Sequence, residues 1–304
     1  MRKESFDPGL TTQFSGELRR TINKDGSFNV QRKGLRWRDA NLYLHMIDTT
    51  WTRFLAIVLV VFLAVNLIFA WAYLAVGIHN LRGTEPELSA FLNAFFFSVH
   101  TLTTVGYGNI YPTGGAANTV SAIEAATGLM VFALVTGLLY GRFSRPSARI
   151  MFSDRALVAP YQDGSSLQFR VANARSNVLM NVEARVLLMT VENVDGQLKR
   201  DFVELPLERP AILFFPLTWT VVHPIDATSP LQGKTPQDLA NVAAELLILL
   251  QGFDDTFSQV VHSQYSYRHD EIVWGAKFTP AFRVDPKGFL VVEVDRISER
   301  KTVG

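Results

Sequence analysis

Two long apolar runs dominate the hydrophobic pattern in the first half of the chain. Residues 54–78 contain no charged side chain, and residues 116–140 contain one, Glu124. At 1.5 Å per residue, a run of about 25 residues makes a helix of about 37 Å, enough to cross a hydrocarbon core about 30 Å thick. The pattern therefore predicts two membrane-spanning helices, an outer helix over 54–78 and an inner helix over 116–143.

A shorter apolar run lies between the two spans. Residues 90–101 are rich in aromatic side chains and too short to cross a bilayer, and Ser89 precedes them as a helix cap. This pattern predicts a pore helix over 89–101. The negative end of its dipole would point toward a central cavity and favour a cation there.

The N-terminal residues divide into two parts. Residues 1–36 are polar and predict a poorly ordered arm with a short strand at 27–31. In residues 37–52 apolar side chains recur at helical spacing among charged ones, which predicts an amphipathic helix in the membrane interface. The alternative is that this stretch simply extends the first span.

The second half of the chain has the pattern of a β domain. Short apolar segments alternate with turn sequences such as Asp163-Gly164 and Asp195-Gly196, which predicts an antiparallel sandwich over 147–304, after a pore domain over 53–146. One short helix is expected at 236–242. The expected strands are 150–158, 167–172, 178–191, 202–205, 212–215, 218–222, 244–251, 260–267, 271–277 and 288–294.

The stretch between the pore helix and the inner helix carries the candidate chemistry. Residues 103–108 read Thr-Thr-Val-Gly-Tyr-Gly, and TVGYG is a sequence in which backbone carbonyls replace the water around a potassium ion. Gly106 and Gly108 allow the left-handed dihedrals that such a loop needs. We expect K+ to bind at Thr104, Val105, Gly106 and Tyr107, with Thr103 and Gly108 at the ends. One copy supplies a fraction of the ion cage, so a homotetramer is expected.

The charge distribution predicts the orientation in the membrane. The net charge of +1 hides ten Lys and Arg residues in positions 1–53 and a single one, Arg82, in positions 79–117. The positive-inside rule places both termini in the cytoplasm of a protein that crosses the inner (plasma) membrane more than once. The first apolar run starts too late for a cleaved signal peptide. The chain has no cysteine, which excludes disulfides and fits a cytoplasmic second half.

The predicted inner helix has a face suited to a cavity and a gate. Phe132, Thr136 and Tyr140 are four residues apart and share this face, and Gly137, like Gly128, allows close packing or bending. Repeated four times, an aromatic residue at the cytoplasmic end would form a hydrophobic constriction. The alternative is that these aromatic side chains pack against lipid or a neighbouring helix.

Glu124 needs a partner, because an ionisable group inside a span is costly to bury. His100, at the end of the predicted pore helix, is the nearest candidate by topology. We expect a His100–Glu124 contact that supports the filter. The alternative is that Glu124 faces a wet cavity.

Several stretches together resemble a known family across nearly the whole chain. They are TLTTVGYG (101–108), TGLLYGRFSRPSARIMFS (136–153), RVANARSNVL (170–179), HPIDATSPL (223–231), LLQGFDDT (249–256) and HDEIVWGAKF (269–278), together with the interfacial helix up to Trp51. The chain resembles prokaryotic inward-rectifier potassium channels of the KirBac type. The resemblance implies a homotetramer whose immunoglobulin-like cytoplasmic domain extends the pore.

The resemblance also implies roles for individual residues. Tyr140 would lie at the bundle-crossing gate. A loop would narrow the cytoplasmic pore with Gly252, Phe253, Asp254, Asp255, Thr256 and Ser258. Cationic side chains near the membrane would meet anionic lipids, phosphoinositides among them: Arg53, Arg142, Arg145 and Arg149. The alternative is that these arginines only reflect ordinary positive-inside topology. Bacterial relatives are typically inhibited by phosphoinositides.

Three departures from the family pattern change the expectations. Phe132 stands where strongly rectifying relatives have an acid or Asn, so we expect weak rectification, with Ba2+, Mg2+ and polyamines as pore blockers. Animal members pair a Glu and an Arg at the positions of His100 and Ile110, and this chain has neither. Asn109 follows the filter where many bacterial relatives have Asp.

Other functions fit the sequence less well. A potassium-uptake transporter needs four pore repeats in one chain, and this chain has one. Two hypotheses stay open: a two-span channel gated by another cytoplasmic ligand, and a membrane-anchored β-sandwich that binds a protein. The six histidines show no metal-ligand spacing or nucleophile partner, so we expect no enzyme, no cofactor besides K+ in the pore, and no nucleic-acid partner. His223 or His262 is a candidate pH sensor.

Overall fold

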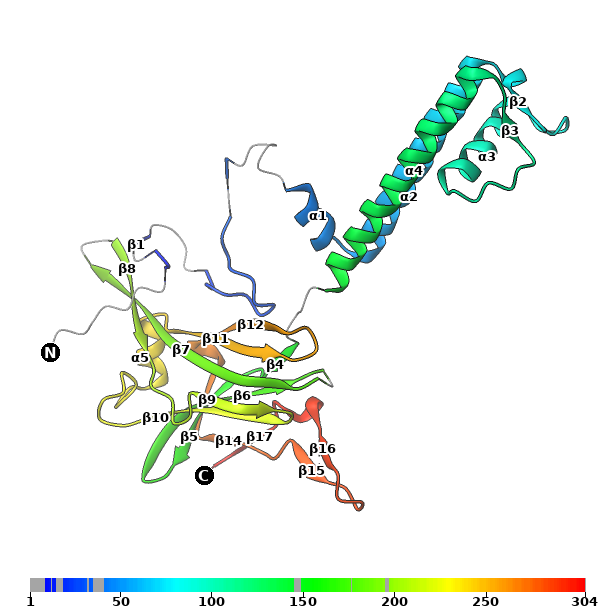
Figure 1. Cartoon of the computed structure of the whole chain (residues 1–304). Coiled ribbons are helices and arrows are strands. Elements are labelled where there is room, and N and C mark those ends of the chain that lie inside the picture. The colour runs from blue at the N-terminus through cyan, green and yellow to red at the C-terminus, as the bar shows by residue number, and fades with distance from the viewer. Residues whose placement is uncertain are drawn as a thin grey trace. The chain divides into compact units, whose positions relative to one another are not determined.

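The chain folds into two units, shown in a computed structural model in Figure 1. One unit contains residues 33–145, and the other combines residues 1–32 with 146–304. The structure describes residues 9–11, 13–14, 19–31, 33–34, 41–144, 149–175, 177–194 and 197–303. Each unit is described by itself below.

The described part of the first unit contains four α-helices. They are α1 (Leu42–Asp48), α2 (Trp51–Val76), α3 (Ala90–Leu102) and α4 (Gly114–Phe143). Helices α2 and α4 are long and apolar enough to cross a membrane, which agrees with the two predicted spans. The interfacial helix is shorter than the predicted 37–52: Asn41 caps α1, the backbone is extended at Thr49 and Thr50, and residues 37–40 lie outside the described part.

Local backbone and capping contacts hold the segment between α2 and α4 together. Ser89 caps α3 as predicted, with its Oγ accepting from the Leu92 amide at 3.2 Å. Strands β2 (Leu81–Arg82) and β3 (Tyr111–Pro112) pair across the two ends of the segment. Gly83 follows with a φ of +79°, and a Cβ there would lie 1.8 Å from the Asn109 carbonyl oxygen, so only glycine fits.

The second unit is a sandwich of two β-sheets. In the first sheet the strand order is β1 (Gln13–Phe14), β8 (Gln197–Glu204), β7 (Leu179–Val194), β11 (Glu245–Asp254), β12 (Gln259–Arg268), and β9 (Ala211–Phe215) also pairs with β7. In the second sheet the order is β10 (Thr218–Ile225), β6 (Gly164–Asn173), β5 (Ala156–Tyr161), β13 (Ile272–Trp274), and β4 (Ile150–Phe152) also pairs with β6. The short helix α5 (Pro236–Asn241) lies where the sequence predicted it.

The fold class agrees with the sequence prediction, but some details differ. The sandwich is not purely antiparallel, because β13 runs parallel to β5. The predicted strand 150–158 is broken at Ser153, whose hydroxyl is bonded to the Arg155 carbonyl and the Tyr267 hydroxyl. The predicted strand 271–277 is broken at Gly275, where φ is +67°, and continues as β14 (Ala276–Phe278), which pairs with β17 (Arg300–Thr302). Strand β15 (Phe282–Val284) pairs with β16 (Leu290–Val292).

The core of the sandwich lies between its two sheets. In β11 alternate residues Leu246, Ile248 and Leu250 are buried there, facing side chains such as Phe169 and Val221 of the other sheet. This alternation follows from the two-residue period of a strand. Leu247 points the opposite way and is also buried, so this strand is covered on both faces.

A segment of the N-terminal arm covers the second face of β11. Ile22 is buried in a cluster with Leu247 and other apolar side chains of the first sheet. The Thr21 amide and hydroxyl donate to the buried Glu245 carboxylate at 3.0–3.1 Å. The prediction of a poorly ordered arm is therefore wrong for residues 19–31. The predicted strand at 27–31 is reduced to one bridge between Ile22 and Phe28.

Charged contacts hold the same segment in place. Arg20 and Lys24 both form ion pairs with Glu271. The Lys24 ammonium also lies 4.4 Å from the centre of the Tyr265 ring, a cation–π contact. Burial lowers the pKa of Lys24, and the Glu271 hydrogen bond opposes that shift. The polar composition of the arm concealed these contacts, because few apolar residues of its described part take part: Ile22 is buried, and Leu10 packs against the same cluster.

His223 is a buried member of the sandwich. Its Nδ1 donates to the Pro206 carbonyl at 2.6 Å, and its Nε2 lies 2.8 Å from the Ser229 hydroxyl. Burial lowers the pKa of His223, opposed by the bond to Pro206 and the charge of Asp226. The other candidate pH sensor, His262, is exposed on β12.

We predict that His223 makes the sandwich less stable in mild acid. Because the folded state keeps His223 neutral, its contribution is complete above the ordinary histidine pKa of about 6.5 and is lost as the pH falls toward the lowered folded value. Thermal unfolding of the full chain should therefore drop more steeply below pH 6.5 in the wild type than in His223→Gln. An extra drop of about 2–4 °C corresponds to about 1 kcal/mol. His262→Gln is the matched control, and equal slopes for all three proteins would contradict the prediction.

Candidate ion-conduction site

The loop after α3 has the alternating backbone that an ion-binding filter needs. Thr104, Gly106 and Gly108 have φ values of +59°, +55° and +79°, so every second residue from 104 to 108 is left-handed. The two glycines take this conformation as predicted. The left-handed conformation of Thr104 was not predicted, because the sequence analysis assigned this conformation to glycine residues alone.

The amide groups of the loop are turned toward the pore helix. Val105 and Gly106 both donate to the His100 carbonyl, at 3.0 and 3.2 Å, and Thr104 donates to the Thr101 carbonyl at 3.0 Å. The Thr103 hydroxyl donates to the Val99 carbonyl at 2.6 Å. Among the described residues, no donor is bonded to the carbonyl oxygens of residues 104–107. The loop therefore offers carbonyl oxygens to a ligand and keeps its donors for the helix.

The predicted pairing of His100 with Glu124 is wrong. Both carboxylate oxygens of Glu124 are occupied by other side chains: the Tyr73 hydroxyl lies 2.5 Å from Oε2 and the Ser98 hydroxyl 2.5 Å from Oε1. The imidazole of His100 instead packs edge-on against the Tyr107 ring, with the ring centres 4.8 Å apart. Glu124 is fully buried, so within the protomer it does not face a wet cavity either.

Tyr73, Ser98 and the neighbouring Asn66 were missed as site residues. All three are buried around Glu124, and Ser98 Oγ lies 3.0 Å from Asn66 Oδ1. A signal was present in the sequence, because Asn66 is the one amide side chain in the apolar run 54–78. Polar side chains inside a span usually bond to each other between helices.

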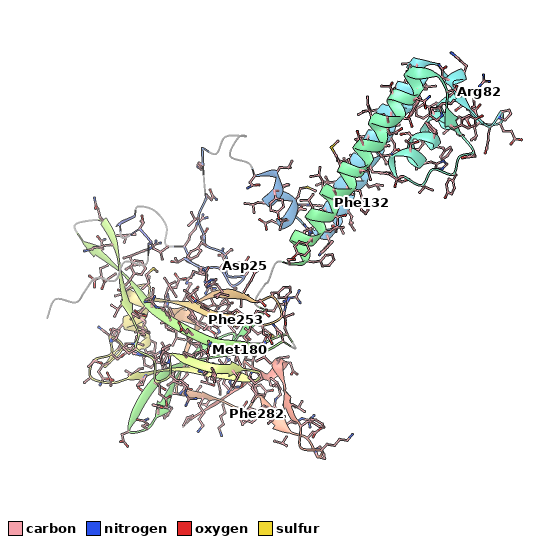
Figure 2. The ribbon with its side chains drawn as sticks, in the orientation of Figure 1. Asp25, Arg82, Phe132, Met180, Phe253 and Phe282 are labelled. Atoms are coloured by element: carbon pink, nitrogen blue, oxygen red, sulfur yellow. The ribbon has the colours of Figure 1, made fainter. Side chains whose placement is uncertain are left out.

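The inner helix presents the expected residues on an exposed face. Phe132 and Tyr140 are each 73% exposed, and Thr136 and Gly137 between them are also exposed (Figure 2 labels Phe132). Gly128 has a different environment. A Cβ at this position would lie 2.1 Å from the Leu102 carbonyl oxygen, so Gly128 permits the close approach of α4 to the end of α3.

The loop predicted to narrow a pore takes in the end of β11, residues 252–254, and the turn from β11 to β12. Asp255, Thr256 and Ser258 are exposed, and Ser258 has a strained φ of +51°. Phe253 is half-exposed. It pairs in register with Met180 of β7, and Figure 2 labels both residues.

Two residues of that loop do not present side chains to a pore. Gly252 is buried, and a Cβ there would lie 3.0 Å from Val182. Asp254 is 1% exposed, and its carboxylate accepts from Asn177 at 2.8 Å and from the Thr256 amide at 3.0 Å. Asp254 therefore holds the loop in shape, and Asp255 carries its exposed charge.

The four predicted lipid-binding arginines fall into different environments. Arg53 and Arg149 are exposed, and Arg145 lies outside the described residues. Arg142 is directed inward instead. Its guanidinium donates to the carbonyls of Met46, Ile47 and Thr49 at 2.6–2.9 Å.

Arg142 thus closes the C-terminal end of α1. Its guanidinium also lies over the rings of Trp51 and Phe54, 4.6 and 4.7 Å from the ring centres. The unpaired carbonyls at the end of a helix favour a cation. Arg142 therefore ties α1 to the end of α4 through its two terminal nitrogens, Nη1 and Nη2, which donate to protein carbonyls.

Comparison with known proteins agrees with this arrangement. A family model described as the inward rectifier potassium channel C-terminal domain matches residues 150–304, and one described as ion channel matches residues 57–145. The chain is 36% identical over 284 residues to the inward rectifier potassium channel Kirbac3.1 of Paramagnetospirillum magnetotacticum, covering 92% of this chain and 95% of that one. It is 27% identical over 312 residues to the G protein-activated inward rectifier potassium channel 3 of Mus musculus and of Rattus norvegicus, covering 93% of this chain and 77% of theirs.

The fold and the family models together define a two-span ion channel with a largely β second unit. The chain belongs to the inward rectifier potassium channel family. Potassium is the permeant ion of this family, and the chain is a membrane protein rather than an enzyme.

We predict that Arg142 is required for the order of α1. Replacing it with Gln removes the charged donors from three carbonyls, and a bond to a charged group contributes about 1.5–3 kcal/mol. Hydrogen exchange at residues 42–48 should then accelerate by roughly 30-fold, which corresponds to about 2 kcal/mol. Arg142→Lys should restore only part of the protection, because a single ammonium cannot reach three carbonyls as the planar guanidinium does.

Hydrogen exchange followed by mass spectrometry provides the measurement. Arg53→Gln, which removes an exposed charge nearby, is the matched control and should leave the exchange of residues 42–48 unchanged. Equal protection of α1 in the wild type and Arg142→Gln would show that the helix is held by other contacts.

Proposed function

We propose that the chain is one subunit of a homotetrameric, potassium-selective channel. Four copies of residues 103–108 surround the pore, and K+ is coordinated by oxygens of Thr104, Val105, Gly106 and Tyr107. The observation that carries this proposal is the left-handed backbone at every second residue, combined with amides that bond to the pore helix. This geometry leaves a row of carbonyl oxygens free to replace ion hydration.

The exposed apolar residues support assembly. In the loop, Val105 is 53% exposed and Tyr107 is 73% exposed. On α4, Phe132 and Tyr140 are each 73% exposed. Apolar side chains gathered around one functional loop are typical of a surface that other subunits cover. In the tetramer Phe132, Thr136 and Tyr140 line the cavity, and Tyr140 forms the bundle-crossing gate.

The proposal includes a second constriction and an orientation. The β domain is cytoplasmic and extends the pore, with the exposed residues Phe253, Asp255, Thr256 and Ser258 at its narrowest part. Both termini lie in the cytoplasm, and the protein resides in the inner (plasma) membrane. Rectification is weak, because Phe132 offers no carboxylate to Mg2+ or a polyamine, while Ba2+ blocks at the filter.

Rubidium uptake into liposomes tests the proposed conduction. Liposomes that contain purified wild-type protein should take up rubidium, driven by an outward potassium gradient. They should exclude sodium, and Ba2+ should block the uptake. Gly106→Ala should abolish selective uptake, because a left-handed conformation costs a residue with a Cβ roughly 1–2 kcal/mol. Gly164→Ala is the matched control, since its φ is ordinary and nothing lies within 4 Å of the added Cβ. A monomer in detergent, or sodium uptake equal to rubidium uptake, would refute the proposal.

We further propose that anionic lipids, phosphoinositides among them, modulate the channel through Arg53, Arg149 and Arg145. The exposed position of the first two supports this role. Arg142 contributes indirectly through α1, because its guanidinium is already bonded to carbonyls.

Titration of the liposomes with phosphoinositide tests the lipid proposal. A basic residue near an anionic surface contributes about 1 kcal/mol, so Arg149→Gln should raise the lipid fraction that gives half of the maximal effect on uptake by roughly fivefold. Arg53→Gln should act in the same direction. Lys301→Gln, which removes an exposed charge on β17, is the control and should have no effect. An identical titration curve for all the variants would contradict the proposal.

A further inference from the structure

Ser98 lies between two residues that offer it acceptors, Glu124 and Asn66, in the buried cluster behind the filter. Its Oγ lies 2.5 Å from Glu124 Oε1, 3.0 Å from Asn66 Oδ1 and 3.2 Å from the Asn66 backbone carbonyl oxygen. The orientation of the Asn66 amide is set by its Nδ2, which donates to the Phe62 carbonyl at 2.8 Å. Asn66 Oδ1 therefore faces Ser98 and acts only as an acceptor.

The number of protons in this cluster limits its possible states. A serine hydroxyl has one proton, so Ser98 can donate to Glu124 or to Asn66 but not to both. If Glu124 is ionised, it accepts the hydrogen bond of the Ser98 hydroxyl, and the buried Asn66 Oδ1 is left without a donor. If Glu124 carries a proton on Oε1, it donates to Ser98, which is then free to donate to Asn66. Only the neutral acid satisfies every group.

The surroundings of Glu124 favour the same state. The side chain is fully buried, and among the described residues no Lys, Arg or His forms an ion pair with it. Its other oxygen, Oε2, accepts from the Tyr73 hydroxyl at 2.5 Å. An isolated buried carboxylate is far more costly than a hydrogen-bonded neutral acid.

The cluster joins the three helices that surround the filter. Asn66 and Tyr73 belong to α2, Ser98 to α3 and Glu124 to α4. Ser98 is two residues before His100, whose carbonyl receives the Val105 and Gly106 amides. The position of Ser98 therefore influences the position of the filter amides.

We propose that Glu124 is a neutral carboxylic acid and that its proton completes a directed relay, Tyr73 to Glu124 to Ser98 to Asn66, which positions the pore helix behind the filter. The first part, the proton, stands on the hydrogen-bond count alone. The second part, the positioning role, rests on the proposed potassium conduction. Tyr73, Ser98 and Glu124 are positioning residues, since they act on the ion through α3.

The Glu124→Gln variant distinguishes between the two protonation states of Glu124, the neutral acid and the carboxylate. The glutamine amide can donate to Ser98 and its oxygen can accept from Tyr73, which reproduces every bond of the neutral acid. It cannot reproduce the pattern around a carboxylate, where both oxygens accept, because the amide nitrogen cannot accept from the Ser98 hydroxyl. We therefore expect Glu124→Gln to keep the rubidium-over-sodium uptake ratio of the wild type.

Removing single members of the relay should have the opposite effect. Ser98→Ala and Tyr73→Phe each leave a buried acceptor without its donor, and we expect the uptake ratio to fall roughly fivefold or more. Thr119→Ala is the control on α4, because its hydroxyl bonds only to the Gly115 carbonyl of its own helix, and it should keep the ratio. Thermal unfolding of each variant shows which of them fold.

Infrared difference spectroscopy of the full-length protein in lipid bilayers decides the protonation directly. The wild-type minus Glu124→Gln spectrum at neutral pH should contain the C=O stretching band of a protonated carboxyl group, shifted in D2O. A carboxylate band in its place would overturn the proposal. This measurement needs no flux, so it remains decisive even if the conduction proposal fails. A normal uptake ratio in folded Ser98→Ala and Tyr73→Phe would overturn the positioning role and leave the proton assignment standing.

Discussion

The hydrogen bonds from the Val105 and Gly106 amides to the His100 carbonyl are the constraint on which the helical unit depends. A loop that exposes a row of carbonyls on one side must place its N–H groups somewhere else, because buried donors cannot be left unpaired. Here the last turn of α3 accepts them. The alternating left-handed residues make this possible, since each reversal of the backbone turns the next amide back toward the helix. The orientation of the 103–108 loop thus depends on the position of α3.

The rest of the unit holds α3 in the position that this loop requires. Ser89 fixes its first turn, and Gly128 lets α4 reach the Leu102 carbonyl at its last turn. The cluster around Glu124 connects its middle to both long helices. Contacts of this type are expected in a membrane, where apolar burial contributes little to helix association and close packing and polar bonds decide it.

The sequence revealed the features that depend on local pattern. Two spans, a capped pore helix, a glycine-dependent loop and most strands of the sandwich follow from hydrophobic period, turn residues and one short motif. The partner of Glu124 does not follow, because it depends on how α2, α3 and α4 are rotated about their axes, and that is decided by packing. His100 was near in topology but faces Tyr107. In the same way, the sequence placed Asp254 in the right loop but could not show that its carboxylate is buried.

The arm that covers the outer face of the β domain has a consequence for how this domain is defined. Leu247 and its neighbours are buried by Ile22, and the Glu245 carboxylate takes its bonds from Thr21, although more than two hundred residues separate the two parts in sequence. A fragment that begins after α4 would lack this cover and expose an apolar, acidic surface to water. The folding unit of the second half is therefore discontinuous, and the whole membrane unit is an insertion between its first segment and the remainder.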